Sequence, residues 1–282
     1  MFGHPYFQRE ISLATKHEKL KLVKPAFDKY VDCKLFEANV DTDVLGTFTG
    51  EIERTLPPLE TAVKKARLGM KISGSRIGIA SEGSVSPDRN IPFLNSNVEW
   101  LVLVDDEREI VISKAYRSFD ICAATIKALP GEDLTPFLKK ADFPNHALIV
   151  RPESGSAPES IKGIRDIDVL SQAIKKISST SQSGYVVIES DLRAMCSPSR
   201  QRNIEKAAEL LALRVSQLCP GCGAPGWGCV EYERGVRCSA CGTLNEPALR
   251  QEKLGCVACE YVELGKVLAE DINPANCINC NP

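Results

Sequence analysis

The stretch Arg76-Ile-Gly-Ile-Ala-Ser-Glu-Gly-Ser84 combines a short apolar run with a polar end. Residues 76–80 predict a strand, and residues 81–84 predict that polar groups gather where this strand ends. The preceding segment, 58–68, places apolar side chains at helical spacing, and Gly69 suits the end of a helix. A helix followed by a strand in this way is typical of an α/β protein.

The same alternation extends to both sides of this unit. A long helix is expected after residue 196, because Ser197 suits its N-cap and Pro198 its first helical position. The other expected strands are residues 11–15, 33–40, 98–104, 109–113, 146–150 and 185–188, and the other expected helices are residues 20–31, 120–129 and 168–177. We therefore predict an α/β fold in which a mixed sheet is flanked by helices.

The composition is that of an ordinary folded protein. The chain has 282 residues, 43% of them hydrophobic and 26% charged, and its net charge of −2 gives no general attraction to nucleic acid or anionic membranes. No apolar run approaches the ~20 residues of a membrane span. Residues 1–10 lack the apolar segment of a signal peptide, so we expect a cytoplasmic protein that does not bind membranes.

Cysteines are concentrated near the C-terminus. Of the 12 cysteines, nine lie between Cys219 and Cys280, and eight of these form four Cys-x-x-Cys pairs. The first two pairs are 15 residues apart and the last two 17, which is the spacing typical of tetrahedral zinc sites. Because protein thiolates fill every position, we expect two structural Zn²⁺ ions. The expected ligands are Cys219, Cys222, Cys238, Cys241, Cys256, Cys259, Cys277 and Cys280.

These four pairs can be combined in two ways. We first expect two sequential sites, in which the first two pairs bind one zinc ion and the last two bind the other. In the alternative, cross-braced arrangement the first pair joins the third and the second joins the fourth. Cys229 is left over and is expected not to bind metal. The sequences Cys219-Pro-x-Cys-Gly223 and Cys238-x-x-Cys-Gly242 resemble the two knuckles of a zinc ribbon.

A change in charge marks where this module begins. From Ser216 onward the chain carries five basic and eight acidic residues, and we place the boundary near residue 217. The expected domains are an α/β domain at 1–217 and a zinc-ribbon module at 218–282. Zinc–tetrathiolate centres add more negative charge, so nucleic-acid binding is disfavoured and a stabilising or protein-docking role is expected.

Polar side chains follow several of the predicted strands. In open α/β sheets ligands bind beyond the carboxyl ends of the strands, where cationic and hydroxyl groups hold phosphate and carboxylates hold Mg²⁺. The expected substrate-binding residues are Thr15, Lys19, Asp191, Arg193 and Arg200, and the expected catalytic carboxylates are Glu82, Asp41 and Asp43. No Ser–His–Asp triad is evident in the sequence.

The order of these motifs resembles a known superfamily. The motifs are Ala14-Thr-x-x-x-Lys19, Glu60-Thr-Ala-x-x-Lys65, the turn with Glu82, the strand with Trp100, and Asp191-Leu192 before a long helix. Over residues 10–215 they are similar to the inosine/xanthosine triphosphate pyrophosphatases, which hydrolyse aberrant purine nucleotides. The chain departs from that pattern at residues 16–19, where those enzymes usually carry Asn-Pro.

A second resemblance covers more of the chain. The segment Asp41-Thr-Asp-x-x-Gly-Thr-Phe-Thr-Gly-Glu51, the Ser81-Glu-Gly-Ser84 turn and the C-terminal zinc ribbon are similar to an uncharacterised bacterial family. The first functional hypothesis is a hydrolase that uses Mg²⁺ to act on a nucleotide or another phosphorylated small molecule. The alternative is a non-catalytic sensor or adaptor that binds a protein partner through its zinc ribbons.

Overall fold

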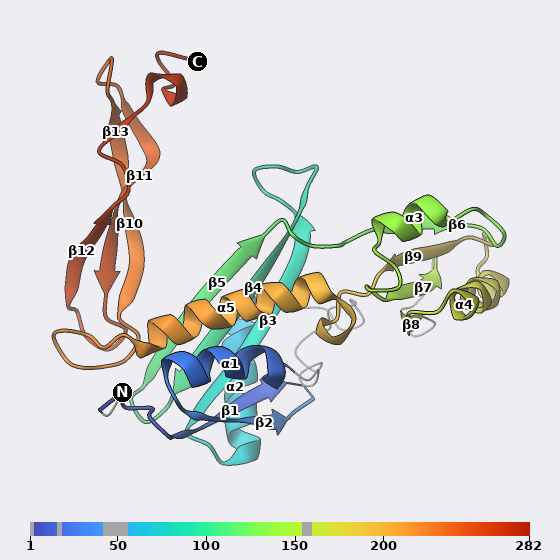
Figure 1. Cartoon of the computed structure of the whole chain (residues 1–282), viewed down its shortest axis with the longest axis horizontal. Helices are drawn as coiled ribbons and strands as arrows, with labels where there is room; N and C mark the ends of the chain where they lie inside the picture. The colour runs from blue at the N-terminus through green and yellow to red at the C-terminus, as the bar shows by residue number, and fades with distance from the viewer. Residues whose placement is uncertain (1–2, 16–18, 42–55, 154–159) are drawn as a thin grey trace.

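The computed structural model describes residues 3–15, 19–41, 56–153 and 160–282. Three sheets organise these residues: a central sheet, a smaller sheet in a second lobe, and a long, narrow sheet near the C-terminus (Figure 1). The second lobe and the C-terminal sheet extend from opposite sides of the central unit. Residues 1–217, predicted as one α/β domain, thus contain two separate sheets.

The central sheet is mixed, as predicted, with strand order β2-β1-β3-β4-β5. β1 runs parallel to β2 and β3, whereas β3, β4 and β5 form an antiparallel meander. These strands are β1 (Glu10–Thr15), β2 (Lys34–Asn39), β3 (Ile77–Pro87), β4 (Asn95–Asp105) and β5 (Ile110–Ser118). The stretch at 76–84 therefore lies in the middle strand.

Helices cover both faces of this sheet. Successive strand residues point to opposite faces, so Leu13 of β1 packs in a cluster with α1 (Leu20–Tyr30) and α5 (Pro198–Ser216), whereas Ala14 packs with α2 (Pro58–Ser73). The α2 backbone approaches β1 closely, because a Cβ built on Gly69 would lie 2.8 Å from that of Ala14. Small residues on this face thus determine how near the helix packs.

The helix ends follow local sequence signals. Ser197 caps α5 by accepting the Arg200 backbone N–H at 3.4 Å, and Pro198 begins the helix, as predicted. α2 continues past the predicted stop at Gly69 and ends at Gly74, which has a left-handed φ of 73°. Within the described ranges, no helix is long and apolar enough to cross a membrane.

The second lobe is an antiparallel sheet with two helices. Its strand order is β6-β9-β7-β8. Its elements are β6 (Thr125–Ala128), α3 (Thr135–Lys140), β7 (Leu148–Pro152), β8 (Ile161–Ile164), α4 (Ile167–Thr180) and β9 (Val186–Ser190). The helix predicted at 120–129 is wrong, because residues 125–128 pair with β9 and this tertiary pairing overrides the local helical spacing.

The C-terminal sheet forms an arm, which we define as residues 219–282. It contains β10 (Gly228–Cys238), β11 (Leu244–Gly255), β12 (Val262–Val267) and β13 (Asp271–Ile272). Arg214 at the end of α5 ties the base of the arm to the central unit by donating from Nε to the Gly226 carbonyl at 3.1 Å and from Nη1 to the Ser113 carbonyl at 3.0 Å. The rest of the arm stands away from the central sheet (Figure 1).

Candidate anion site and cysteine metal centres

Three cationic and two acidic side chains converge beyond the end of β1. The β1–β3 register pairs Ala14 with Ala80, so β3 continues past the end of β1 and carries residues 81–83 to this edge of the sheet. The converging side chains come from five elements or their ends: Lys19, Lys65, Glu82, Glu99 and Arg200. We call these five residues the charged cluster.

Glu82 and Lys65 form one ion pair of the cluster. Lys65 Nζ lies 2.6 Å from Glu82 Oε2, and the two side chains are only 10% and 2% exposed. Lys19 Nζ donates to Ser81 Oγ at 2.8 Å, one residue before Glu82. The prediction that the strand ends at residue 80 is wrong, because β3 stays paired with β4 as far as Pro87, so residues 81–84 lie within the strand. This polar segment receives two lysines, one from each side of the sheet.

Glu99 and Arg200 form the second ion pair. Arg200 Nε lies 2.6 Å from Glu99 Oε1, and Asn97 Nδ2 donates to the same oxygen at 3.0 Å. Arg200 Nη1 also donates to the Leu192 carbonyl at 2.8 Å. Gly83 makes room for this pair, because a Cβ at that position would lie 2.3 Å from Glu99 Oε1.

The electrostatics of the cluster favour an anion. Among the described side chains of the cluster, three cations face two carboxylates, which leaves one formal positive charge. Burial, and next the charge of Arg200, lower the pKa of Lys19 to about 8. The charged form of Lys19 is disfavoured in these surroundings, and a nearby negative charge would stabilise it. Phosphate oxygens are suitable partners for ammonium and guanidinium groups.

The structure brings together part of the predicted site. Lys19, Glu82 and Arg200 belong to the cluster, and Thr15 is buried at the end of β1. Asp41 lies two residues beyond β2 and is exposed. Asp43 lies outside the described residues. The cluster thus contains three of the residues that the sequence predicted.

Two members of the cluster were missed by the functional prediction. Lys65 belongs to the Glu60-Thr-Ala-x-x-Lys65 motif and is 8% exposed in α2. Glu99 is fully buried in β4 among apolar neighbours. A charged residue inside an apolar strand is the signal that could have identified it, since buried charges need a partner.

Asp191 and Arg193 do not join the charged cluster. Arg193 Nη2 lies 2.6 Å from Asp191 Oδ2, and the same oxygen accepts the Gly163 backbone N–H at 3.0 Å. Burial opposes ionisation of Asp191, but the bonds from Arg193 keep its pKa below the usual value. These residues follow β9, which belongs to the second sheet. The end of β9 lies beside the end of β3, since residues of both line one pocket, but Asp191 is paired with Arg193 and not with a member of the cluster.

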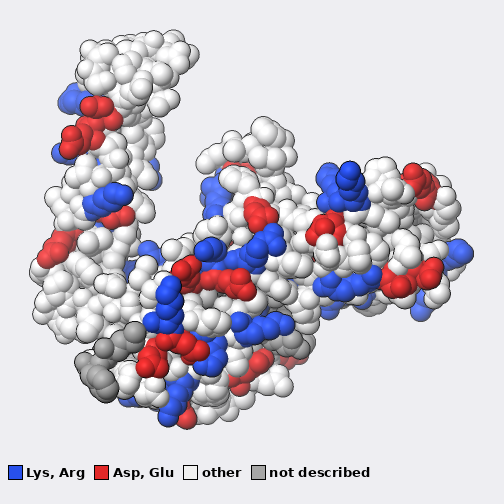
Figure 2. Space-filling model, in the orientation of Figure 1, with Lys and Arg blue, Asp and Glu red and all other residues white. Residues whose placement is uncertain are grey.

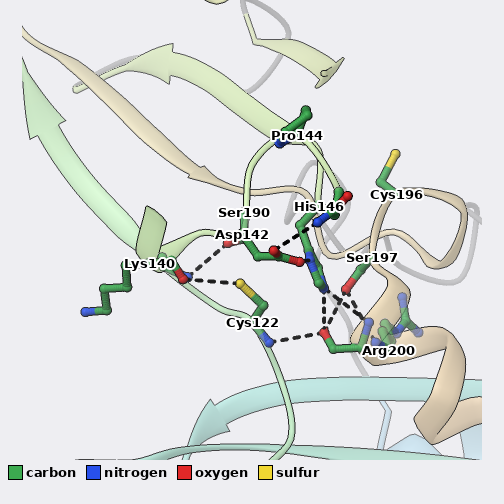
Figure 3. A network of polar contacts seen from close by, with 12 residues as sticks. Cys122, Lys140, Asp142, Pro144, His146, Ser190, Cys196, Ser197 and Arg200 are labelled. Carbon is green, nitrogen blue, oxygen red and sulfur yellow. Dashed lines mark hydrogen bonds and ion pairs between the residues drawn. The ribbon is translucent and has the colours of Figure 1, made fainter. Parts of the chain in front are cut away.

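A Ser–His–Asp arrangement is present that the sequence did not reveal (Figure 3). His146 Nδ1 lies 2.8 Å from Asp142 Oδ2, and Nε2 lies 2.9 Å from Ser199 Oγ. Nε2 also accepts the Ser199 backbone N–H at 3.1 Å, which places the ring proton on Nδ1.

Its surroundings indicate a structural role. The Ser199 residue is only 2% exposed, and its hydroxyl oxygen accepts the Cys122 backbone N–H at 3.1 Å. A nucleophile needs access to its substrate, which this hydroxyl lacks. The contacts instead fasten the second lobe to the first turn of α5, one residue before Arg200.

The eight paired cysteines form two groups of four. The groups are Cys219, Cys222, Cys256 and Cys259 at the base of the arm, and Cys238, Cys241, Cys277 and Cys280 at its tip. The arrangement is therefore cross-braced, and the expectation of two sequential sites is wrong. β10 and β11 are antiparallel, so the pair before β10 meets the pair after β11, while the pair at their turn meets the C-terminal pair.

Both groups have dimensions that fit zinc. The Sγ atoms of Cys222 and Cys256 are 3.6 Å apart, and those of Cys238 and Cys280 are 3.9 Å apart. A tetrahedral ion with Zn–S bonds of about 2.3 Å requires S–S edges of about 3.8 Å. Cys229 belongs to neither group and contacts the Glu231 carbonyl, as expected for a cysteine that does not bind metal.

Glycine and hydrogen bonding prepare the knuckles for metal. Gly223 and Gly242 follow the second cysteine of their pairs with φ of 73° and 71°, a conformation that favours glycine. The Thr243 side chain lies 3.2 Å from Cys241 Sγ, and its hydrogen bonding lowers the pKa of this thiol to about 5. Thiolates, which are the form that binds zinc, are therefore favoured at this position.

Fold and sites together define an α/β protein with a C-terminal module that contains two tetracysteine groups able to hold metal ions. Residues 65–282 match the family model described as "Domain of unknown function (DUF6671)", and the chain belongs to this family. Comparison of the sequence with curated proteins finds no match.

Two solved structures show distant similarity. Protein VC0702 from Vibrio cholerae is 13% identical, with a TM-score of 0.32, and the match covers 72% of this chain and 93% of that one. A nucleoside-triphosphatase / dITP/XTP pyrophosphatase from Mycobacterium abscessus is 16% identical, with a TM-score of 0.28, and the match covers 44% and 79% of the two chains.

Proposed function

We propose that the charged cluster binds the phosphate groups of a nucleotide or another phosphorylated small molecule, and that the protein hydrolyses this ligand with the help of Mg²⁺. The observation that carries the proposal is that Lys65 pairs with Glu82, Lys19 donates to Ser81 and Arg200 pairs with Glu99 beyond the end of β1, all close enough for their charges to act on Lys19. Carboxyl ends of parallel strands are where α/β proteins bind such ligands.

The charge balance specifies how a metal ion would fit. Glu82 and Glu99 offer carboxylate oxygens, which Mg²⁺ prefers, but both are held by cations at 2.6 Å. A bare dication would meet a net positive charge among the described side chains of the cluster. Mg²⁺ that is already bound to phosphate oxygens would enter as part of an anion and would avoid this repulsion. The residues therefore fit the metal as part of a metal–phosphate ligand, in which the metal would stabilise negative charge on the leaving group.

The protein's own side chains have distinct roles in this proposal. Lys19 and Lys65 approach the edge of the sheet from α1 and α2 and would hold phosphate oxygens. Arg200, kept in place by Glu99, would add a third positive charge. Glu82 would orient the attacking water once phosphate engages Lys65, and Asp41 beyond β2 is the other expected carboxylate that the structure describes.

One observation favours a second candidate function. Both carboxylates of the cluster are buried and ion-paired, which is the arrangement of a site that holds an anion without cleaving it. The alternative is therefore a sensor that binds a phosphorylated ligand without turnover. In either case we propose that the two tetracysteine groups bind structural zinc ions, since every position of each site is a protein thiolate.

A nucleotide panel tests the proposal. Zinc-loaded protein with Mg²⁺ is incubated with nucleoside mono-, di- and triphosphates, and release of phosphate or pyrophosphate is measured. Glu82→Gln should abolish release, whereas Glu37→Gln, at an exposed position on β2, should not. Binding without release by the wild type would favour the sensor. Release that survives Glu82→Gln would place the chemistry elsewhere.

A further inference from the structure

His146 joins the second lobe to the start of α5 through a ring nitrogen that accepts a hydrogen bond. The residue is 4% exposed and lies on the connection between α3 and β7. Its Nε2 atom accepts the backbone N–H of Ser199 at 3.1 Å, and on the opposite side of the ring Nδ1 lies 2.8 Å from Asp142 Oδ2 (Figure 3). The neutral ring therefore has one partner in its own lobe and one in the helix.

The Ser199 backbone N–H depends on this acceptor. Ser197 is the N-cap of α5, so Ser199 is the second residue of the helix, and the N–H groups of a first turn have no acceptor within the helix. Ser199 is also buried, and a buried N–H that loses its hydrogen bond costs free energy because water does not replace the partner. His146 thus completes the N-terminus of α5.

A second proton on the His146 ring would break this contact. Nε2 would change from an acceptor to a donor, and its hydrogen would point at the Ser199 N–H. The ring would also carry a positive charge at the positive end of the α5 dipole, where cations are unfavourable. Asp142 would attract the charged ring, so a protonated His146 would keep its partner in the second lobe and lose its partner in α5.

Charged and titratable groups surround the ring from each neighbouring segment. Acidic and basic side chains are interspersed over the visible face of the second lobe, so this face creates no strong field of one sign (Figure 2). The groups near the ring, besides Asp142, are Arg200 and Arg202 on α5, Asp120 and Cys122 before β6, Lys140 on α3, Arg165 after β8, and Asp191 and Cys196 between β9 and α5. The charged groups on α5 and after β9 are held in ion pairs of their own, so the contacts with Asp142 and Ser199 decide how His146 responds to a proton.

We propose that His146 is a pH-sensitive latch: below neutral pH, a proton on Nε2 loosens the second lobe from the first turn of α5 and thereby lowers the anion affinity of the charged cluster. Histidine is the side chain that ordinarily takes up a proton in this range. Arg200 follows Ser199 directly, and its Nη1 donates to the Leu192 carbonyl at 2.8 Å, so its position depends on this turn. The effect on anion affinity rests on the proposed function, whereas the loosening does not.

Hydrogen exchange of the zinc-loaded full chain tests the latch itself. It is measured at pH values of about 5.5 and 7.5, with labelling times scaled to the chemical exchange rate at each pH. The first turn of α5 in the wild type should lose about tenfold in protection at the lower pH, the factor expected for one lost hydrogen bond. His146→Gln should show no such change, because the amide oxygen of glutamine can accept the Ser199 N–H and takes up no proton. The control His4→Gln changes a histidine that contacts the Val215 carbonyl at the other end of α5, and it should behave like the wild type.

Asp142→Asn provides a readout that a merely structural contact would not change. The pH at which the first turn of α5 loses half of its protection should move to a lower value, because the carboxylate that favours the charged ring is removed. This variant also tests the latch if His146→Gln does not fold. Wild-type protection that is independent of pH, or a transition that Asp142→Asn leaves in place, would overturn the proposal.

Titration calorimetry with inorganic pyrophosphate at the same two pH values separates the latch from the proposed function. Because pyrophosphate itself takes up protons, the wild type is compared with His146→Gln. From the higher to the lower pH, the affinity of the wild type should fall at least about fivefold more than that of the variant. An equal fall in both proteins would overturn the link between His146 and the charged cluster. Absence of binding at either pH would instead contradict the proposed function, and the exchange experiment would still decide whether the latch exists.

Discussion

Arg200 of α5 and Glu99 of β4 form an ion pair in which Nε and Oε1 are 2.6 Å apart and the side chains are 4% and 0% exposed. The pair links the first turn of the long helix to the middle of the central sheet. Because its two residues are 101 positions apart in the chain, the pair holds elements together that no local interaction connects.

Breaking this pair should strongly destabilise the protein. Glu99→Gln or Arg200→Met leaves one buried charge without its partner, and we expect a loss of about 3–5 kcal/mol in the free energy of unfolding. Urea denaturation measures this loss. The matched control is Asp120→Asn, which removes an exposed pair with Arg202 and should cost less than about 1 kcal/mol. Equal losses in the two experiments would contradict the prediction.

Gly83 should tolerate no side chain. In Gly83→Ala the new Cβ would lie 2.3 Å from Glu99 Oε1 and 2.5 Å from Arg200 Nη2, so the ion pair must move. We expect a loss of about 1–3 kcal/mol in unfolding free energy and weaker binding of pyrophosphate. Ser86→Ala, at an exposed position of the same strand, serves as the control. An unchanged Gly83→Ala protein would show that the pair is not packed against this glycine.

Lys19 should make anion binding depend on pH in the mildly alkaline range. Its pKa of about 8 means that its positive charge is lost as the pH rises through that value. The affinity for pyrophosphate should therefore be lower at a pH of about 9.5 than at a pH of about 7, as measured by titration calorimetry. Lys19→Gln should flatten this dependence, whereas Lys21→Gln, at an exposed position of α1, should preserve it.

Lys19 should also make the free energy of unfolding depend on pH, in the direction opposite to its effect on anion affinity. The pKa of Lys19 in the folded state lies below the unfolded value of about 10.4, so between these values the unfolded chain binds more protons. The contribution of Lys19 to the free energy of unfolding therefore rises with pH over that window. Urea denaturation of the wild type and Lys19→Gln across the window checks the sign, and a falling difference would contradict it.

Zinc content should report the cross-braced arrangement directly. Cys219→Ser with Cys256→Ser changes one group only, so the variant should retain one of the two zinc ions. Cys219→Ser with Cys238→Ser changes both groups and should lose both ions. Metal analysis after gel filtration distinguishes these outcomes. Two sequential sites would give the reverse pattern, and Cys229→Ser should bind as much zinc as the wild type.

His146 should be required for the junction between the second lobe and α5. His146→Ala leaves the Ser199 amide and hydroxyl buried without this partner, and we expect a loss of about 1–3 kcal/mol. Hydrogen exchange should become faster in the first turn of α5. Asp142→Asn keeps an oxygen acceptor for Nδ1 and should have a smaller effect. Unchanged exchange in His146→Ala would show that other contacts hold the junction.

The local elements were largely readable from the chain. The apolar run at 77–80, the Ser197-Pro198 helix start and the four Cys-x-x-Cys pairs each depend on neighbours a few residues apart, and all appear in the structure. The mixed sheet with flanking helices followed from their alternation. The helix predicted at residues 120–129 is wrong, because the pairing of Thr125–Ala128 with β9 outweighs the local preference for a helix that the spacing of apolar residues indicated.

Three features depended on tertiary structure alone. Asp191 and Glu82 were both predicted at strand ends, but Glu82 lies within β3 and Asp191 follows β9 of the second sheet, where it pairs with Arg193. The partner of Glu99 lies about a hundred residues away, and spacing carries no information on such a contact. Cysteine spacing specifies that two thiols share a knuckle, whereas the antiparallel path of β10 and β11 decides which knuckles meet, because it returns the chain to its starting end.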